Sequence, residues 1–194
     1  MTYPTGNKGS YFKVCLIGDG GVGKTSLRER VLGEDFESTY LLTIGADFAI
    51  YQADIDGHIY KFQIWDLSGQ QRFDIVRAVY YRGSHGAILV FDQTRPESFS
   101  NLENWRKELF THVNRRVPFI LLGNKCDLRS KIDRNALNEF IEKSEKEFSY
   151  AGNPFSIPYL DTSARTGHNV NEAFETLIMA IRNFVINNVK KTKH

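Results

Sequence analysis

The sequence predicts an α/β fold, in which a six-stranded, mostly parallel sheet has one antiparallel edge strand and about five helices on its two faces. Short apolar runs alternate along the chain with stretches of helical periodicity, which is the pattern of such folds. Residues 87–91 and 119–122 are almost continuously apolar, as in parallel strands that are covered on both faces. Asp56-Gly57 joins two β-rich runs, which predicts a hairpin and one antiparallel pair.

The individual elements follow from local patterns. Strands are predicted at residues 12–17, 47–55, 58–65, 87–91, 119–122 and 158–160. Helical spacing of apolar residues predicts helices around 25–32, from Pro96 past Leu109, over 132–148 and from Val170 to Val185. Pro96 suits a first turn, because its missing N–H would have no partner inside the helix. We expect the apolar positions of these elements to form the core.

Length and composition indicate one globular domain. The chain has 194 residues, of which 41% are hydrophobic and 25% charged, and its net charge is +2. These values exclude a disordered chain and do not suggest a protein that coats nucleic acid. Cys15 and Cys126 make no disulfide or zinc framework, and no apolar run reaches the roughly 18 residues of a membrane span. We expect a flexible segment at residues 1–10, one domain at residues 11–189 and a short basic tail at residues 190–194.

A glycine-rich loop between the first strand and the first helix predicts a phosphate site. It reads Gly18, Asp19, Gly20, Gly21, Val22, Gly23, Lys24, Thr25, and it fits G-x-x-x-x-G-K-[ST]. The glycines let backbone N–H groups converge on a phosphate, and the helix N-terminus adds partial positive charge. Lys24 can reach the β- and γ-phosphates, and the Thr25 hydroxyl can ligate Mg²⁺. We therefore predict a P-loop nucleotide-binding fold.

A second motif selects the base. Asn124-Lys125-Cys126-Asp127 follows an apolar strand about 100 residues after the phosphate loop. A carboxylate at Asp127 can accept both N–H groups of a guanine edge, whereas adenine would leave it unpaired and buried. Thr162-Ser163-Ala164 closes the last strand, where backbone amides can meet the carbonyl oxygen of the base.

With these motifs in this order, the chain resembles the Ras-superfamily small GTPases, and within them the Rab family. The Rab likeness depends on Thr43-Ile44-Gly45-Ala46-Asp47-Phe48, Lys61-Phe62-Gln63-Ile64-Trp65-Asp66 and Tyr80-Tyr81-Arg82-Gly83, and the whole resemblance covers about residues 10 to 187. It implies a Ras-like G domain that binds GTP or GDP with Mg²⁺.

The resemblance also implies site roles. Gln70 would orient the attacking water, with Lys24 and the Gly69 N–H as further catalytic groups at the phosphates. Thr25, Thr43 and, through water, Asp66 would hold Mg²⁺. The nucleotide would also contact Ser26, Phe36, Tyr40, Asn124, Lys125, Asp127, Ser163, Ala164 and Arg165. Three of these have plain alternatives: Asp66 could merely end a strand, and Thr43 and Tyr40 could be ordinary loop residues.

Several positions depart from the Rab pattern. Switch II reads Asp66-Leu67-Ser68-Gly69-Gln70-Gln71, so the catalytic glutamine is present and the usual glutamate after it is not, which puts the mode of nucleotide exchange in doubt. Residues 74–79 are atypical as well, so effector preference cannot be carried over. Arg165 replaces a usual lysine, and residues 149–157 form a longer connection than is usual. No cysteine follows Cys126, so the sequence is either truncated or naturally lacks prenylation.

We therefore expect a GTP-binding molecular switch that slowly hydrolyses GTP and presents residues 36–48 and 67–83 to effectors, with Phe48, Trp65 and Tyr80 as anchors or as packing residues. Exchange factors and a GTPase-activating protein are expected partners; nucleic acid is not. The expected form is a cytoplasmic monomer, recruited to a membrane by partners or by a missing tail, with a role in membrane trafficking. Three alternatives stay open: a module that holds nucleotide without turnover, a P-loop kinase for a small acceptor, and a translational GTPase.

Overall fold

The computed structural model describes residues 11–33, 45–55, 57–70, 74–149 and 155–191. The strands are β1 (Tyr11–Ile17), β2 (Ala46–Ile55), β3 (His58–Leu67), β4 (Gly86–Asp92), β5 (Phe119–Asn124) and β6 (Tyr159–Asp161). The helices are α1 (Lys24–Val31), α2 (Asp74–Tyr81), α3 (Pro96–Ser100), α4 (Leu102–Val113), α5 (Arg134–Phe148) and α6 (Val170–Lys191). All six predicted strands are present.

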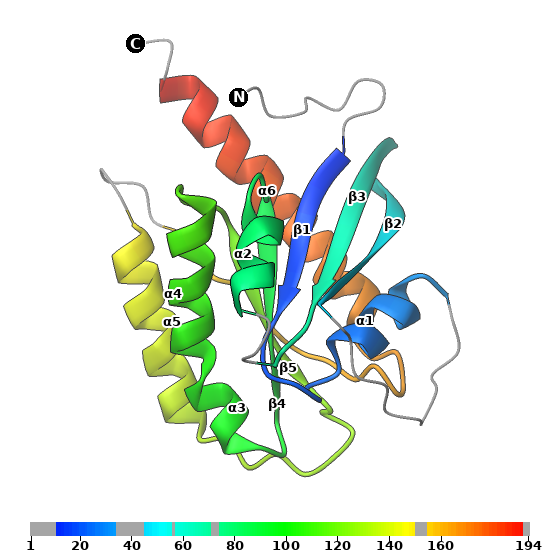
Figure 1. Cartoon of the computed structure of the whole chain (residues 1–194), viewed down its shortest axis with the longest axis vertical. Coiled ribbons are helices and arrows are strands. Elements are labelled where there is room, and N and C mark those ends of the chain that lie inside the picture. The colour runs from blue at the N-terminus through cyan, green and yellow to red at the C-terminus, as the bar shows by residue number, and fades with distance from the viewer. Residues whose placement is uncertain (1–10, 34–44, 56, 71–73, 150–154, 192–194) are drawn as a thin grey trace.

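One sheet contains the six strands in the order β2-β3-β1-β4-β5-β6 (Figure 1). Every neighbouring pair is parallel except β2 and β3, which pair antiparallel along their whole length. Ile55 pairs with His58 across the end of the hairpin, and Gly57 has a φ of +74°. The predicted α/β fold with one antiparallel edge strand is confirmed.

Helices cover both faces of the sheet, and β1 shows why. Its residues alternate in direction, so Val14 and Leu16 pack with α1 and α6, whereas Cys15 and Ile17 pack with α2, α4 and α5. In Figure 1, α6 passes behind the strands, and α4 and α5 stand together at one side. The near-continuous apolar runs of β4 and β5 are therefore buried on both faces.

The helices differ from the sequence prediction in detail. The helix expected from Pro96 is divided into α3 and α4, with only Asn101 between them. The short helix α2, which follows switch II, had not been assigned from local patterns. The last helix continues to Lys191, past Val185, where the predicted apolar face ended. No helix in the described ranges is long and apolar enough to cross a membrane.

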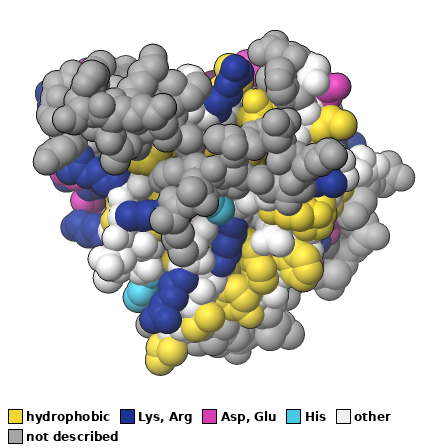
Figure 2. Space-filling view, turned by 90° about the horizontal axis from the view of Figure 1, so that it is seen from above, with side chains coloured by type: hydrophobic (Ala, Val, Ile, Leu, Met, Phe, Trp, Pro, Cys, Tyr) yellow, Lys and Arg dark blue, Asp and Glu magenta, His cyan; other side chains and the backbone are white. Residues whose placement is uncertain are grey.

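Parallel strands bring their carboxyl ends to one edge of the sheet, at the lower end of Figure 1. The phosphate loop follows β1 there, and the base motif follows β5. Figure 2 views the opposite end, where hydrophobic side chains reach the surface beside lysines and arginines. Tyr11 and Ile59, near the starts of β1 and β3, are both exposed. The phosphate loop and the base motif lie at the other end of the sheet.

Candidate functional site

The phosphate loop, residues 18–25, packs tightly on the strands beside it. Gly18 has a φ of +142°, and a Cβ there would lie 2.1 Å from the carbonyl oxygen of Val90. At Gly23, with a φ of +97°, a Cβ would lie 2.3 Å from Nδ2 of Asn124. The Val22 side chain is buried in the core, so this residue offers only its backbone to a ligand. The loop therefore requires glycine for both its conformation and its close contacts.

Lys24, the first residue of α1, lies almost fully buried at the centre of the loop. Its Nζ donates to the carbonyl oxygens of Gly18 at 2.7 Å and Asp19 at 2.8 Å. Burial lowers the pKa of Lys24 to about 8, and the nearby Asp66 and Asp19 carboxylates only partly oppose this shift. An anionic phosphate would add a strong charge partner for this buried lysine.

Next to Lys24, the Thr25 hydroxyl donates to Oδ2 of Asp66. Asp66 is in β3 and its side chain is fully buried, although it comes from a part of the chain 41 residues away. A hydroxyl and a carboxylate side by side at a phosphate loop are hard oxygen ligands, which is the donor set that Mg²⁺ prefers. The residues present therefore fit a magnesium ion. Ser26 follows in α1, one position further along.

The carboxylate of Asp19 is held by α4 and by its N-cap residue. Trp105 Nε1 donates to Asp19 Oδ1 at 2.7 Å, and Asn101 Nδ2 donates to Oδ2 at 2.8 Å. Arg95 Nη2 donates to the carbonyl oxygen of Gly20 at 2.8 Å. These contacts fix the Asp19 carboxylate beside the loop, where it also lies near Lys24. Sequence analysis missed all three donors, since nothing in the chain links them to the loop.

The base motif lies beside the phosphate loop. Asn124 is buried; its Nδ2 donates to the Val22 carbonyl oxygen at 2.8 Å, and its Oδ1 accepts from the Ala164 N–H at 3.1 Å. Asp127 Oδ1 accepts from the Ser163 hydroxyl at 2.6 Å, and Asp127 stays partly accessible. The structure thus brings the two predicted base segments together, and Asn124 joins both to the phosphate loop.

Three residues outside the motifs contact the base segments: Arg30, Asp92 and Arg165. Arg30 of α1 donates from Nε to the carbonyl oxygen of Ala164 and from Nη2 to that of Arg165, each at 2.9 Å. Lys125 has a φ of +66°, and its Nζ lies 2.6 Å from Oδ2 of Asp92. The Arg165 side chain is largely exposed, with Nη1 3.8 Å from Asp127. The sequence analysis had not indicated Arg30 or Asp92.

The segment 68–70 lies directly against the phosphate loop. A Cβ at Gly69 would lie 2.3 Å from the backbone nitrogen of Gly20. Arg77, from α2, donates to the carbonyl oxygens of Ser68 at 3.1 Å and Gln70 at 2.7 Å. The structure thus places Gly69 against the phosphate loop, with Gln70 next to it in the chain, and it adds a buried arginine that the sequence had not indicated.

The three aromatic residues considered as effector anchors form one row. Phe48 stacks on Trp65, with ring centroids 5.1 Å apart, and Trp65 packs on Tyr80 at 4.9 Å. Phe48 is 53% exposed, whereas Trp65 and Tyr80 are half-buried against the core. Trp65 and Tyr80 therefore act as packing residues, whereas Phe48 presents an exposed ring. Phe36, Tyr40, Thr43 and Gln71 lie outside the described residues.

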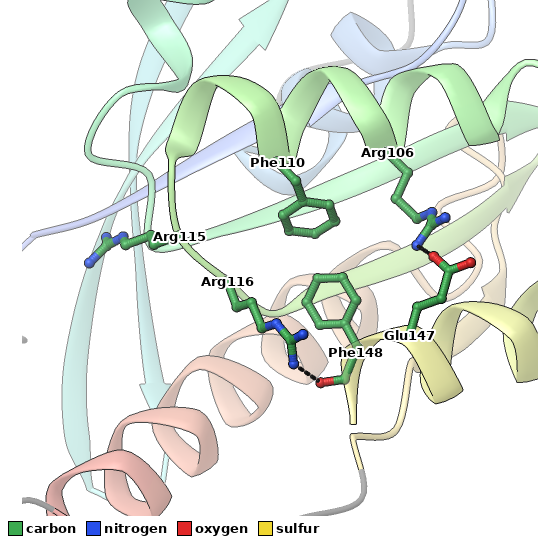
Figure 3. A pocket seen from close by; sticks show the side chains of 6 residues that line it. All are labelled: Arg106, Phe110, Arg115, Arg116, Glu147 and Phe148. Carbon is green, nitrogen blue, oxygen red and sulfur yellow. Dashed lines mark hydrogen bonds and ion pairs between the residues drawn. The ribbon is translucent and has the colours of Figure 1, made fainter. Parts of the chain in front are cut away.

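A separate hollow of about 350 Å³ lies between α4 and α5 (Figure 3). Its arginines already have partners: Arg106 pairs with Glu147, and Arg116 donates to the carbonyl oxygen of Phe148 at 2.8 Å. It shares no residue with the site at the phosphate loop.

The site has the features of a P-loop protein that binds guanine nucleotides. They are a glycine loop after a strand, a buried lysine, a hydroxyl–carboxylate pair and an N-K-x-D segment. The comparisons agree, because a sequence profile of the Ras family matches residues 13–183. Ras-related proteins Rab-13 from Mesocricetus auratus, Bos taurus and Rattus norvegicus are each 43% identical to this chain, over 86% of this chain and 77% of the relative. The chain belongs to the Ras family as a Rab-like small GTPase, a GTP-binding switch with GTPase activity.

Proposed function

We propose that the phosphate loop, the segment 66–70 and the two base segments form one Mg²⁺·GTP site, in which Gln70 directs hydrolysis. The observation that carries this proposal is the group made by Lys24, Thr25 and Asp66. It combines a buried, underpartnered cation with a hydroxyl–carboxylate pair, all beside the loop. A triphosphate would bring negative charge to Lys24, and its metal ion would meet the oxygens of Thr25 and Asp66.

Guanine recognition falls to Asp127. Its carboxylate accepts from Ser163, which leaves further lone pairs for the two N–H groups of a guanine edge. Asn124 acts as a positioning residue, because both ends of its amide are bonded within the protein. The Ala164 N–H donates to Asn124 Oδ1, so it holds this amide in place beside Asp127.

Thr25 would hold Mg²⁺ through its hydroxyl, and Asp66, through water, and Thr43 would complete the protein's contribution to the ion. When bound, the ion neutralises charge on the β- and γ-phosphates. Lys24 adds a second positive charge at the same oxygens. Hydrolysis of this bond requires positioning and charge stabilisation and little covalent work from the protein. Gln70 provides positioning, because it orients the attacking water. The Gly69 N–H holds the γ-phosphate.

The output of the switch is a nucleotide-dependent surface on residues 36–48 and 67–83. Its exposed ring, Phe48, lies at the end of the aromatic row, where an effector would bury it. Exchange factors and GTPase-activating proteins act on the same loops. We place the protein as a monomer in the cytoplasm, recruited to membranes through partners, with a role in membrane trafficking like that expected of Rab proteins.

The test is single-turnover decay of preloaded GTP with Mg²⁺ and without partners, followed as bound GTP and bound GDP. We expect slow conversion to bound GDP, and competition by GTP but not by ATP. Thr25→Ala should weaken Mg²⁺-dependent retention of nucleotide, whereas Thr111→Ala, an exposed threonine on α4, is the matched control. Persistent GTP in the parent protein would contradict hydrolysis and favour a nucleotide-holding module. Equal competition by ATP would contradict the assignment of Asp127.

A further inference from the structure

Arg77 occupies an unusual position for a charged side chain in a switch segment, because it is 2% exposed. Its Nη1 donates to the carbonyl oxygens of Ser68 and Gln70. On its other side, Nε and Nη2 donate to the two carboxylate oxygens of Glu108 in α4, at 2.6 and 3.0 Å. One guanidinium thus joins the backbone of switch II to a helix.

The same helix continues the connection to the phosphate loop. Trp105 precedes Glu108 by three residues, so both side chains lie on one face of α4. The Arg77 guanidinium lies over the Trp105 ring, 4.7 Å from its centroid. The indole Nε1 of that ring donates to Asp19 in the phosphate loop at 2.7 Å. Unbroken contact therefore runs from Gln70 through Arg77 and Trp105 to Asp19.

We propose that Arg77, Trp105 and Glu108, here called the α4 cluster, couple the position of switch II to that of the phosphate loop. Arg77 is the positioning residue for the Gln70 backbone, and Trp105 is the positioning residue for Asp19. The part that concerns hydrolysis rests on the proposed function, in which Gln70 orients water.

The chemistry of arginine explains why this position can couple two loops. A planar guanidinium carries five N–H donors, so it binds a carboxylate with two of them and still reaches two carbonyl oxygens. A buried guanidinium is costly without partners, so Arg77 stays with Glu108. When the carbonyl groups of Ser68 and Gln70 move away, the Nη1 donors lose their acceptors, which penalises that movement. A lysine at this position has a point charge and cannot make both sets of bonds.

Coupling between two sites is reciprocal, and this gives the test. Arg77→Lys removes the guanidinium geometry, and Trp105→Phe keeps a ring under residue 77 but removes the N–H to Asp19. Both rates, single-turnover GTP hydrolysis and GDP dissociation, are measured for each variant and for the double variant. Lys107→Gln, which changes an exposed α4 side chain, is the matched control.

We expect Arg77→Lys to slow hydrolysis roughly tenfold and Trp105→Phe to speed GDP dissociation several-fold, as the loss of a hydrogen bond to a charged group would give. The decisive result is the cross effect: Arg77→Lys also speeds GDP dissociation, and Trp105→Phe also slows hydrolysis. The double variant then changes each rate by less than the product of the single changes. Separate effects that multiply, with no cross effect, would overturn the proposal.

Tryptophan emission gives an independent measurement. The chain has two tryptophans, so Trp65→Phe leaves Trp105 as the reporter. We expect the Trp105 emission to change as bound GTP becomes bound GDP, and Arg77→Lys to remove this change. If the Arg77→Lys variant does not fold, Glu108→Gln is measured in its place. The glutamine amide keeps one oxygen that can accept a hydrogen bond from Arg77. An emission that is equal in the GTP and GDP states would overturn the coupling.

The two proposals fail in different ways. If the parent protein does not hydrolyse GTP, the proposed role of Gln70 is wrong, and the coupling is judged by GDP dissociation and by emission with GDP against no nucleotide. If the parent hydrolyses GTP, Gln70→Leu does not, and Arg77→Lys retains the parental rates, the role of Gln70 holds and the α4 cluster is not a coupler.

Discussion

Asn124 Nδ2 donates to the carbonyl oxygen of Val22 at 2.8 Å, across 102 positions of sequence. The same side chain accepts the N–H of Ala164, so one buried amide holds the phosphate loop, the N-K-x-D segment and the last base segment together. Because the amide donates at one end and accepts at the other, no side chain of similar shape but different polarity can replace it. The phosphate and base sites are therefore built as one unit.

Asn124→Asp tests the two hydrogen bonds that the Asn124 side chain makes. The new carboxylate would face the Val22 carbonyl oxygen without a proton to donate, which costs about 1–3 kcal/mol for a buried, unsatisfied group. We expect nucleotide affinity to fall at least tenfold and unfolding to need less denaturant. Asn104→Asp, an exposed change on α4, is the control. If Asn124→Asp keeps the parental GDP affinity, the contacts of Asn124 with Val22 and Ala164 are not needed for nucleotide binding.

Asp127→Asn tests the choice of base. The amide can still accept from the Ser163 hydroxyl, so the loop should keep its shape. It presents an N–H group where guanine also presents N–H groups, and the preference for guanine should fall by roughly 1–3 kcal/mol. Competition of GTP and ATP for the site measures this. Discrimination against ATP at the parental level would exclude Asp127 as the base-reading residue.

Gln70→Leu tests the proposed positioning of water. Leucine has a similar size but no polar group, so GTP should bind normally while single-turnover hydrolysis loses most of its rate. The backbone carbonyl that accepts from Arg77 is unaffected by this change. Parallel measurements of GTP affinity separate loss of chemistry from loss of binding. Equal hydrolysis in variant and parent would remove Gln70 from the mechanism.

The lowered pKa of Lys24 predicts a pH dependence with a definite sign. Burial lowers this pKa from 10.5 to about 8, so above pH 8 the nucleotide-free protein loses the charge that phosphate binds. GDP affinity should therefore fall as pH rises from about 7 to about 9, towards tenfold per unit at the upper end. A flat profile over this range would contradict the predicted role.

Stability of the nucleotide-free protein should change in the opposite direction. The Lys24 pKa is lower in the folded state than in the unfolded chain, so its burial penalises folding below pH 8. This penalty should be relieved as pH rises through 8 towards 10.5. Denaturant unfolding across that range, compared with Lys24→Met, isolates the contribution. A Lys24→Met variant with the same pH dependence as the parent would exclude Lys24 as its source.

Gly69→Ala tests the close approach of switch II to the phosphate loop. The added Cβ would come within 2.3 Å of the loop backbone, so the segment 68–70 must move away. We expect slower GTP hydrolysis with much smaller loss of GDP affinity, because GDP lacks the γ-phosphate that the Gly69 N–H is expected to hold. Gly33→Ala is a poor comparison, since Gly33 has a positive φ; Ser100→Ala, exposed on α3, is the control. Unchanged hydrolysis would show that this contact does not matter for turnover.

Local patterns were sufficient to predict much of this protein. The alternation of β1, the apolar runs of β4 and β5 and the turn at Gly57 each report a local environment, and each is confirmed by the sheet. Phosphate chemistry is equally local, because a loop of eight consecutive residues contains its glycines, its lysine and its hydroxyl. Helix α2 was missed because local patterns did not indicate it. Its sequence has no strong start signal, and contacts with α4 hold it in place.

What the sequence by itself determined is therefore the order of the elements, the phosphate loop and the segments that read the base. Only the tertiary structure decided which distant side chains hold those segments in place. Arg30 on Ala164, Trp105 on Asp19 and Arg77 on Gln70 join elements far apart along the chain. The physical reason is that a hydrogen bond depends on distance and direction in space, and the sheet order that sets both is a property of the whole chain.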